Sequence, residues 1–225
     1  MGELTKRILS GVILAALLLG DLWLGSWWYA GLLIIGGLLV YREFARLVLR
    51  VGRRAGSQTL WLVFGVVYIG AALWGLWLVR AHPEHGILFA AWLFLVVWAT
   101  DVGAYVFGRT IGGPKIAPSI SPSKTWAGLL GGVVFTAVVM NVMYRVFTGA
   151  WLETLGGMFV IGVLWGAPLV VVAQAGDFFE SWMTRRANMK DSGTLIPGHG
   201  GLFDRVDGLI PVAILFYPWL GGMLR

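Results

Sequence analysis

Seven long apolar segments dominate this sequence and decide what it can fold into. About 20 consecutive apolar residues form a helix that can cross the hydrocarbon core of a bilayer. Of the 225 residues, 58% are hydrophobic and 12% are charged, against about 45–50% and about 25% in soluble domains. We therefore expect an all-α, polytopic bundle of about seven transmembrane helices. The segments lie at residues 8–24, 27–49, 59–79, 87–108, 126–147, 157–180 and 206–222.

These segments leave little room for anything outside the membrane, so we expect one integral membrane domain over residues 1–225. Its N-terminal helices occupy residues 1–85, and residues 86–225 carry two long polar loops, 109–125 and 181–204. The first apolar segment follows two basic residues, as in a signal peptide, but no small-residue cleavage site comes after it. We expect this segment to be retained as a helix.

The basic residues are distributed unevenly between the two sides that seven crossings create. Of the 17 Lys and Arg residues, only Arg80, Arg145 and Arg225 fall on the side away from the N-terminus. The positive-inside rule then places the N-terminus and both polar loops in the cytoplasm and the C-terminus outside.

Charge and cysteine content exclude several classes of function. The formal net charge is +6, but in a membrane protein basic residues serve orientation and contact with anionic lipid, so we expect no nucleic-acid partner. The sequence contains no cysteine, which excludes disulfides, thiolate nucleophiles and cysteine metal sites. Any metal must be bound by oxygen or histidine ligands.

Acidic residues cluster near the C-terminal end of the sequence. Residues three apart share one face of a helix, so Asp177 can point the same way as Glu180, and Asp204 the same way as Asp207. Carboxylates without cysteine suit Mg²⁺, which binds between a few carboxylates and substrate phosphates. The alternative is that these acids form ion pairs with the basic residues among them. Five of the 11 acidic residues lie in this stretch: Asp177, Glu180, Asp191, Asp204 and Asp207.

A further acid, Asp101, interrupts the apolar segment at residues 87–108. An ionisable residue within a membrane helix is a candidate functional residue, because its insertion is costly. Asp101 could support a metal site or orient a basic residue.

The two polar loops carry residues suited to phosphate. In the stretch GTLIPGHGGLFDRVD (193–207), glycines allow the backbone to approach a ligand, and amides before a helix favour anions. His199 could be a base, a phosphate donor or a simple loop residue. In the other loop, Ser121, Lys124 and Thr125 precede a helix and could hold a polyphosphate, although the stretch is not a Walker motif. The alternative is a basic loop lying on anionic lipid.

Four stretches together resemble the phosphatidate cytidylyltransferase (CDP-diacylglycerol synthase) family. The resemblance covers roughly residues 95–215, about half of the chain. Two features depart from the family pattern: Thr184 stands where the family has lysine before arginine, and the N-terminal part is shorter. The stretches are DVGAYVFGR from Asp101, SPSKTWAG from Ser121, GDFFES from Gly176 and SWMTRRANMKDSGTLIPGHGGLFDRVD from Ser181.

The resemblance implies an enzyme of phospholipid biosynthesis that uses Mg²⁺ to join CTP and phosphatidate into CDP-diacylglycerol, with release of pyrophosphate. It also implies a homodimer in a bacterial-type inner membrane, with the active site facing the cytoplasm. Whether a monovalent cation assists Mg²⁺ stays open. The expected catalytic residues are Asp177, Asp204, Asp207, Lys124 and Arg205, and the three aspartates are the expected metal ligands. The expected substrate-binding residues are Asp101, Ser121, Thr125, Ser181, Arg185, Lys190, Asp191, His199, Gly200 and Gly201.

Three alternative functions remain from the sequence. A CTP-dependent polyprenol or phytol kinase would use the same nucleotide, and CDP-archaeol synthesis would differ only in the lipid. A transporter would also satisfy the hydropathy. Transporters often place charges near the midplane in repeated halves, whereas the charges here crowd one face and no repeat is visible.

Overall fold

The computed structural model describes residues 20, 26–51, 55–149, 154–196 and 200–223. Apart from residue 20, the first predicted helix lies outside the described residues. The other six apolar segments are helical, as predicted. The elements are α2 (Ser26–Val51), α3 (Ala55–Arg80), α4 (Gly86–Thr110), β1 (Lys115–Ala117), β2 (Ser121–Thr125), α5 (Trp126–Thr148), α6 (Leu155–Phe159), the π-helical turn η1 (Val160–Leu164), α7 (Gly166–Arg186), α8 (Phe203–Val206) and α9 (Leu209–Met223).

Four of the described helices are long and apolar enough to cross a membrane: α3, α4, α5 and the segment 156–186 that contains η1 and α7. The predicted class, an all-α membrane protein, is thereby confirmed. The predicted number of about seven crossings is not established, since neither α2 nor α9 is among these candidates and, apart from residue 20, the first predicted segment lies outside the described residues.

The two polar loops differ from their predicted extent. Residues 109–125 were expected to form a loop, but part of this stretch forms an antiparallel hairpin in which Lys115 pairs with Thr125 and Ala117 with Ser121. Residues 181–186 were assigned to the second loop, but they continue α7. Asn188, with a positive φ of 53°, follows the end of this helix. Ser181 and Arg185 are therefore helical residues.

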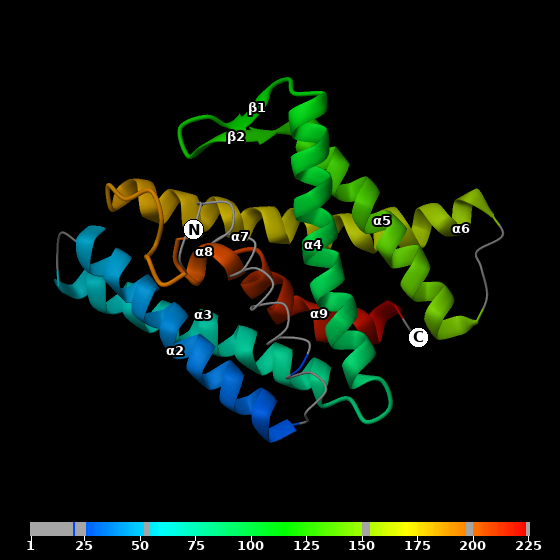
Figure 1. The fold of residues 1–225 in the computed structure, drawn as a ribbon, viewed down its shortest axis with the longest axis horizontal. Helices are drawn as coiled ribbons and strands as arrows, with labels where there is room; N and C mark the ends of the chain where they lie inside the picture. Colours follow the sequence, from blue (N-terminus) through cyan, green and yellow to red (C-terminus); the bar gives the residue numbers. More distant parts are fainter. Residues whose placement is uncertain (1–19, 21–25, 52–54, 150–153, 197–199, 224–225) are drawn as a thin grey trace, which may run out of the picture.

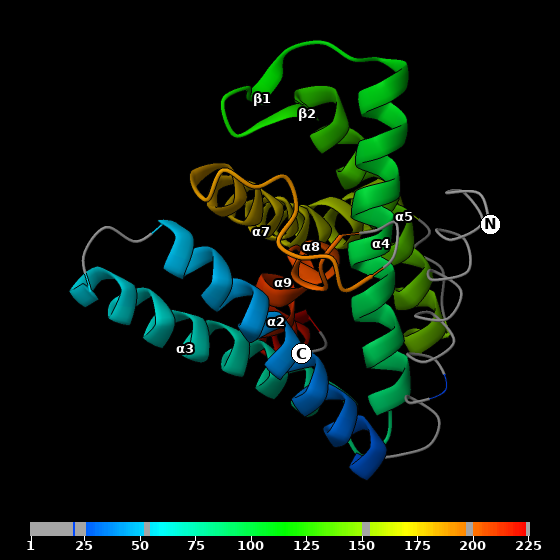
Figure 2. The same ribbon diagram turned by 60° about the vertical axis from the view of Figure 1, so that its left-hand side comes forward.

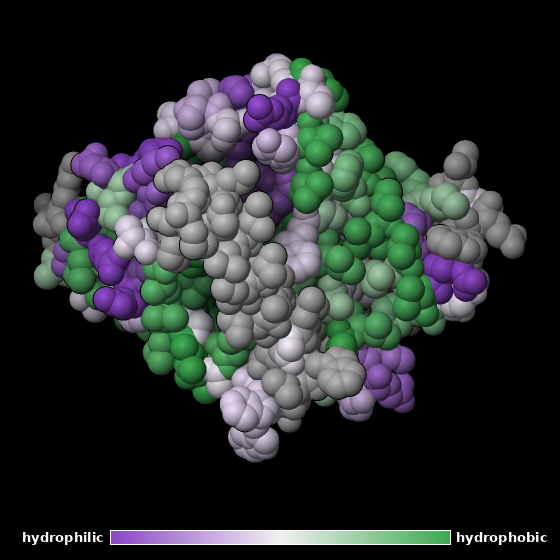
Figure 3. Space-filling model, in the orientation of Figure 1, coloured by the Kyte–Doolittle hydropathy of each residue, from purple (hydrophilic) through white to green (hydrophobic). Residues whose placement is uncertain are grey.

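The hairpin lies beyond one end of α4 and α5 and beside α7 (Figures 1 and 2). Helices α2 and α3 pack together, and α3 packs against α9 on the side away from α7. The core forms where α4 meets α9, around the fully buried Trp92, Val96 and Phe216. Large apolar side chains such as Leu130, Val134 and Val138 of α5 are exposed. Figure 3 shows such side chains over the outer faces of α4 and α5, with hydrophilic residues gathered around the hairpin. The outward apolar faces suit contact with lipid.

Helices α4 and α5 touch through glycine. A Cβ on Gly103 would overlap the carbonyl oxygen of Gly131, and a Cβ on Gly131 would overlap that of Gly103. Small residues of this kind let membrane helices approach until their backbones are in contact. This crossing fixes the relative position of α4 and of the hairpin that leads into α5.

We expect Gly103→Ala to destabilise the protein, because the added methyl group would push α4 and α5 apart. Overpacking of this kind costs about 1–3 kcal/mol, and each kcal/mol lowers Tm by about 2–4 °C in a chain of this size. Thermal unfolding in detergent measures the change. The matched control is Gly70→Ala in α3, where no atom lies within 4 Å of the added Cβ. Equal Tm values for the two variants would contradict the close crossing.

Candidate active site

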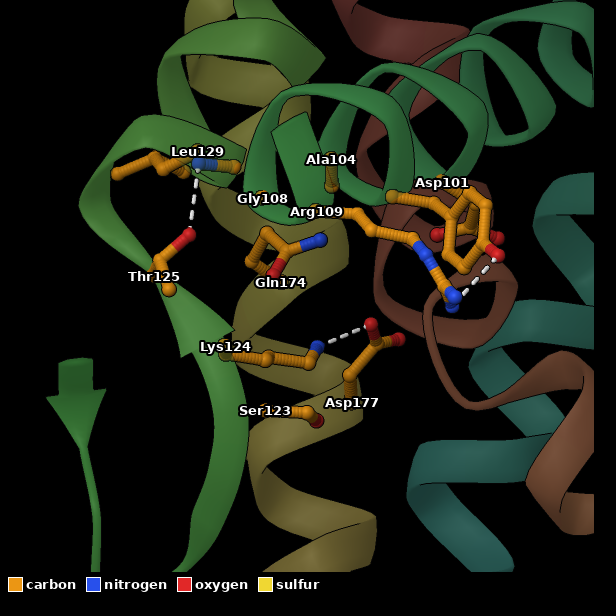
Figure 4. Close-up of a pocket in the computed structure, with 12 residues that line it drawn as sticks. Asp101, Ala104, Gly108, Arg109, Ser123, Lys124, Thr125, Leu129, Gln174 and Asp177 are labelled. Carbon is orange, nitrogen blue, oxygen red and sulfur yellow. Dashed lines mark hydrogen bonds and ion pairs between the residues drawn. The ribbon is translucent and has the colours of Figure 1, made fainter. Parts of the chain in front are cut away.

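A cavity of about 360 Å³ opens between α4, β2, α5 and α7 (Figure 4). Small residues of α4 and α5, Ala104, Gly108 and Gly128, line its wall. Polar residues of α4, β2 and α7 also line the cavity. They are Asp101, Tyr105 and Arg109 of α4, Ser123, Lys124 and Thr125 of β2, and Gln174 and Asp177 of α7.

An ion pair joins two sides of this cavity. The Nζ of Lys124 donates to the Oδ2 of Asp177, which lies 53 residues further along the chain. The side chains are only 19% and 18% exposed, so water screens the pair less than a surface ion pair. Lys124 Nζ also lies 4.9 Å from the ring centroid of Phe178. The ammonium group is therefore held at the cavity between a carboxylate and an aromatic face.

Thr125 fixes the position of Lys124 by ending the strand and beginning the next helix. Its Oγ1 accepts a hydrogen bond of 3.0 Å from Gly128 N, which is an N-cap for α5. The side chain is 2% exposed. The structure thus gives Thr125 a capping contact in addition to its place in the cavity wall. Ser121, at the start of β2, is buried but does not line the cavity.

Asp207 lies next to Asp177, across the junction between α8 and α9. The Asp207 carboxyl group lies within electrostatic reach of Asp177 and Glu180, and its Oδ1 accepts a hydrogen bond of 2.9 Å from Gly208 N. A Cβ on Gly208 would come within 2.9 Å of Asp177 Oδ1. Two carboxyl groups are thus held together with Lys124 as the nearby cation, an arrangement that favours binding of a further positive charge.

Glu180 and Asp204 form a second carboxyl pair. Glu180, one turn after Asp177 in α7, is buried and lies next to the carboxyl group of Asp204. Asp204 also accepts hydrogen bonds from two backbone amides, at 2.8 Å from Ser192 N and at 2.9 Å from Gly201 N. Asp204 therefore anchors the loop formed by residues 191–196 and 200–203, called the glycine-rich loop below, and also lies next to Glu180.

The acids are neighbours but do not form a compact metal cage. Within the part of the chain that the structure describes, no three His, Asp or Glu side chains are grouped as a metal site. The reason lies in their other contacts, since Lys124 engages Asp177 and backbone amides engage Asp204. The roles of Asp177, Asp204 and Asp207 as metal ligands stay predictions.

Asp101 lies at the same cavity, as its place in the apolar segment suggested. Its carboxyl group is within electrostatic reach of Asp177, Lys124 and Arg205. On the same helix, the guanidinium group of Arg109 donates a hydrogen bond of 3.2 Å to Tyr105 Oη. The Asp101 carboxyl group therefore interacts electrostatically both with the exposed Arg205 and with the ion pair of Lys124 and Asp177.

Those of the remaining expected substrate-binding residues that the structure describes lie outside the cavity wall. Ser181 Oγ donates to Glu180 Oε2 at 3.4 Å, and the Gly201 amide is bonded to Asp204. Gly200 has a φ of 85° and its carbonyl accepts from Ile196 N at 2.9 Å. Arg185, Lys190 and Asp191 are exposed, and His199 lies outside the described residues.

Two buried polar residues at the site were missed by the sequence analysis. Gln174 is 6% exposed, lies one turn before Asp177 and faces the cavity. Glu43 of α2 is 4% exposed and contacts the glycine-rich loop. Glu43 is an ionisable residue within an apolar segment, which is the signal that identified Asp101, so the same argument could have found it. Gln174 carries no charge, and only its polarity within an apolar segment could have indicated it.

Four helices long and apolar enough to cross a bilayer, with a polar cavity lined by Lys124, Asp101 and Asp177, define a membrane protein with a charged cavity between its helices. Residues 50–221 match the model of the cytidylyltransferase family. This chain belongs to that family, which confirms the resemblance carried by its sequence motifs.

Several relatives similar to this chain are all named phosphatidate cytidylyltransferase. The phosphatidate cytidylyltransferase of Brucella melitensis is 42% identical over 159 residues, which are 70% of this chain and 56% of that protein. The protein of that name from Rickettsia bellii is 32% identical over 220 residues, which are 96% of this chain and 90% of the relative. A third, from Haemophilus influenzae, is 38% identical over 141 residues and is matched over 47% of its length. The chain thus spans about half the length of several curated relatives.

Proposed function

We propose that this protein transfers the cytidylyl group of CTP to phosphatidate and releases pyrophosphate. The observation that carries the proposal is the cavity in which Lys124 meets Asp177 beside further carboxyl groups, in a chain of the cytidylyltransferase family. The names of the relatives from Brucella and Rickettsia support phosphatidate as the acceptor.

The reaction forms one phosphorus–oxygen bond and breaks another. A phosphate oxygen of phosphatidate attacks the α-phosphorus of CTP, and the bond from that phosphorus to the oxygen bridging to the β-phosphate breaks. Pyrophosphate leaves with the electron pair. Because the attacking phosphate is already anionic, it needs little help from a base, and the obstacle is repulsion between two anions. Catalysis then depends mainly on neutralising charge and on in-line positioning.

The residues around the cavity can supply both effects. Lys124 is held at the cavity by Asp177, so its ammonium group can face the phosphates of CTP without first being ordered. We assign Arg205, which interacts with Asp101, to the second anion. Gln174 offers an amide at the same wall, and we assign it to a hydrogen bond with the bound nucleotide.

We propose Mg²⁺ as the cofactor, held by Asp177, Asp204 and Asp207. The donor set fits this ion, since these are oxygen ligands and the buried carboxyl groups have Lys124 as their close cation. Bound Mg²⁺ would neutralise charge on the phosphate oxygens.

We further propose about seven crossings in a bacterial-type inner membrane, with the N-terminus and the site facing the cytoplasm. The uneven distribution of Lys and Arg supports this orientation, and the cytoplasm is the compartment that supplies CTP. A homodimer is proposed from the family resemblance.

The proposal is tested with the full chain reconstituted into liposomes that contain phosphatidate. We expect labelled CTP and Mg²⁺ to give a labelled CDP-lipid and one pyrophosphate for each lipid converted, and no product when phosphatidate is left out. Formation of CDP and a lipid phosphate from a lipid alcohol would contradict the proposal and indicate a lipid kinase. Accumulation of unchanged CTP inside the vesicles would contradict it in favour of a transporter.

A further inference from the structure

Glu43 is a buried carboxylate in the middle of α2, outside residues 50–221 that match the family. It lies on the buried face of that helix with Val40, Phe44 and Leu47, and it is 4% exposed. Among the described residues it forms no ion pair, and hydrogen bonds to the glycine-rich loop compensate its charge there. A buried carboxylate without such bonds is very unfavourable, which indicates that its partners are specific.

Those partners lie in the two arms of the glycine-rich loop, residues 191–196 and 200–203. Glu43 Oε2 accepts a hydrogen bond of 3.2 Å from Ser192 Oγ in the first arm. The same oxygen accepts one of 2.8 Å from Phe203 N in the second arm. One side chain of α2 thus joins both arms of a loop about 150 residues further along the chain.

The loop has glycine where Glu43 needs space. A Cβ on Gly193 would overlap Glu43 Oε1 and lie 2.9 Å from its Cδ, and a Cβ on Gly201 would lie 2.8 Å from the same Cδ. At Gly193 the three atoms nearest to the added Cβ all belong to Glu43. A side chain at this position would therefore meet Glu43 first.

Asp204 is bonded to the same loop residue as Glu43. The Ser192 amide donates to Asp204 Oδ1 and the Ser192 hydroxyl to Glu43 Oε2, so the two carboxylates hold Ser192 from two directions. We propose that Glu43 is a positioning residue that joins the two arms of the loop and thereby sets the position of Asp204. The effect on turnover rests on the proposed function, whereas the effect on the loop does not.

The test is a double-mutant cycle between Glu43→Ala and Gly193→Ala in the full chain. We expect either change to lower kcat by about 10- to 100-fold, the usual cost of losing a group that orients a ligand of the site. The double variant should be no slower than Glu43→Ala alone, since the three atoms nearest to the added methyl group are then absent. Glu43→Gln, which keeps the acceptor oxygen, should have a kcat within a few-fold of the wild type.

Losses that multiply in the double variant, or a Glu43→Ala variant with normal kcat, would overturn the proposal. Gly36→Ala in α2, with no atom within 4 Å of the added Cβ, is the control.

A second measurement reports on the loop without any turnover. Trypsin should cut faster after Lys190, which is exposed directly before the first arm, in Glu43→Ala than in the wild type. Cleavage after Lys115, in the hairpin that Glu43 does not contact, should keep its rate. Unchanged cleavage after Lys190 would contradict the proposal even if the chain had no cytidylyltransferase activity. Loss of turnover in every variant and in the wild type, with faster cleavage after Lys190, would refute the proposed function alone.

Discussion

Replacing Lys124 with methionine should lower kcat for CDP-lipid formation by about 1000-fold. Loss of one group that stabilises developing charge typically costs about 10²- to 10³-fold, and Lys124 is the cation held directly at the cavity by Asp177. The substitution also leaves Asp177 without its ion-pair partner in a position only 18% exposed, so Tm should fall. Initial rates in liposomes and thermal unfolding in detergent measure the two effects.

The double variant Lys124→Met with Asp177→Asn separates the two effects. It removes both charges, so we expect Tm to return towards the wild-type value while kcat stays low. Recovery of kcat to within tenfold of the wild type would mean that the pair is only structural. Arg50→Met, at an exposed position at the end of α2, removes one positive charge far from the cavity and should leave both quantities unchanged.

Replacing Asp207 with asparagine should reduce turnover by more than about 100-fold while the fold persists. Loss of a residue that merely orients a metal ligand costs about 10- to 100-fold, so loss of a proposed ligand should cost more. Asparagine keeps an oxygen that can accept the hydrogen bond from Gly208 N. It also removes the repulsion from Asp177, so Tm without metal should be unchanged or higher.

The metal role of Asp207 has its own readout in the thermal stability. An ion that binds only the folded state raises Tm as its concentration rises above Kd, so Mg²⁺ should stabilise the wild type. The same titration should leave the Tm of Asp207→Asn nearly constant. Normal turnover of this variant at saturating Mg²⁺ would remove Asp207 from the metal site. Glu84→Gln, in an exposed turn with the carboxylate 81% exposed, is the matched control.

The helices could be predicted because their signal is local. Each apolar segment from 27–49 onward corresponds to a helix within a few residues, since a stretch of about 20 apolar residues has few stable alternatives. The hairpin at β1 and β2 was missed because its Pro, Ser and Lys residues give no alternating pattern, and its register depends on contacts with the ends of α4 and α5. The number of crossings depends on short or charged segments for which hydropathy gives a weak signal.

The site was predictable in its residue types and less so in its contacts. The acids near the C-terminal end were identified from their clustering and spacing, and Asp101 from its cost within an apolar segment; the structure brings Asp101, Asp177 and Asp207 to one region. The pairing of Lys124 with Asp177 joins residues 53 positions apart, and the bond from Phe203 to Glu43 spans 160. Such contacts depend on how helices pack, which a single sequence pattern does not specify.

The glycine contacts described above also bear on how the molecule can move. Gly103 and Gly131 bring the backbones of α4 and α5 together, and Gly176 does the same for α7 and the backbone of Asp207. Each pair should move as one rigid body, because backbones in contact cannot slide without clashing. Lys124 belongs to the first body and Asp177 to the second, so their ion pair is one of the contacts that join the two bodies, and it lies at the cavity itself. A widening of the cavity between β2 and α7 for an incoming nucleotide should therefore break this ion pair, and closure should re-form it.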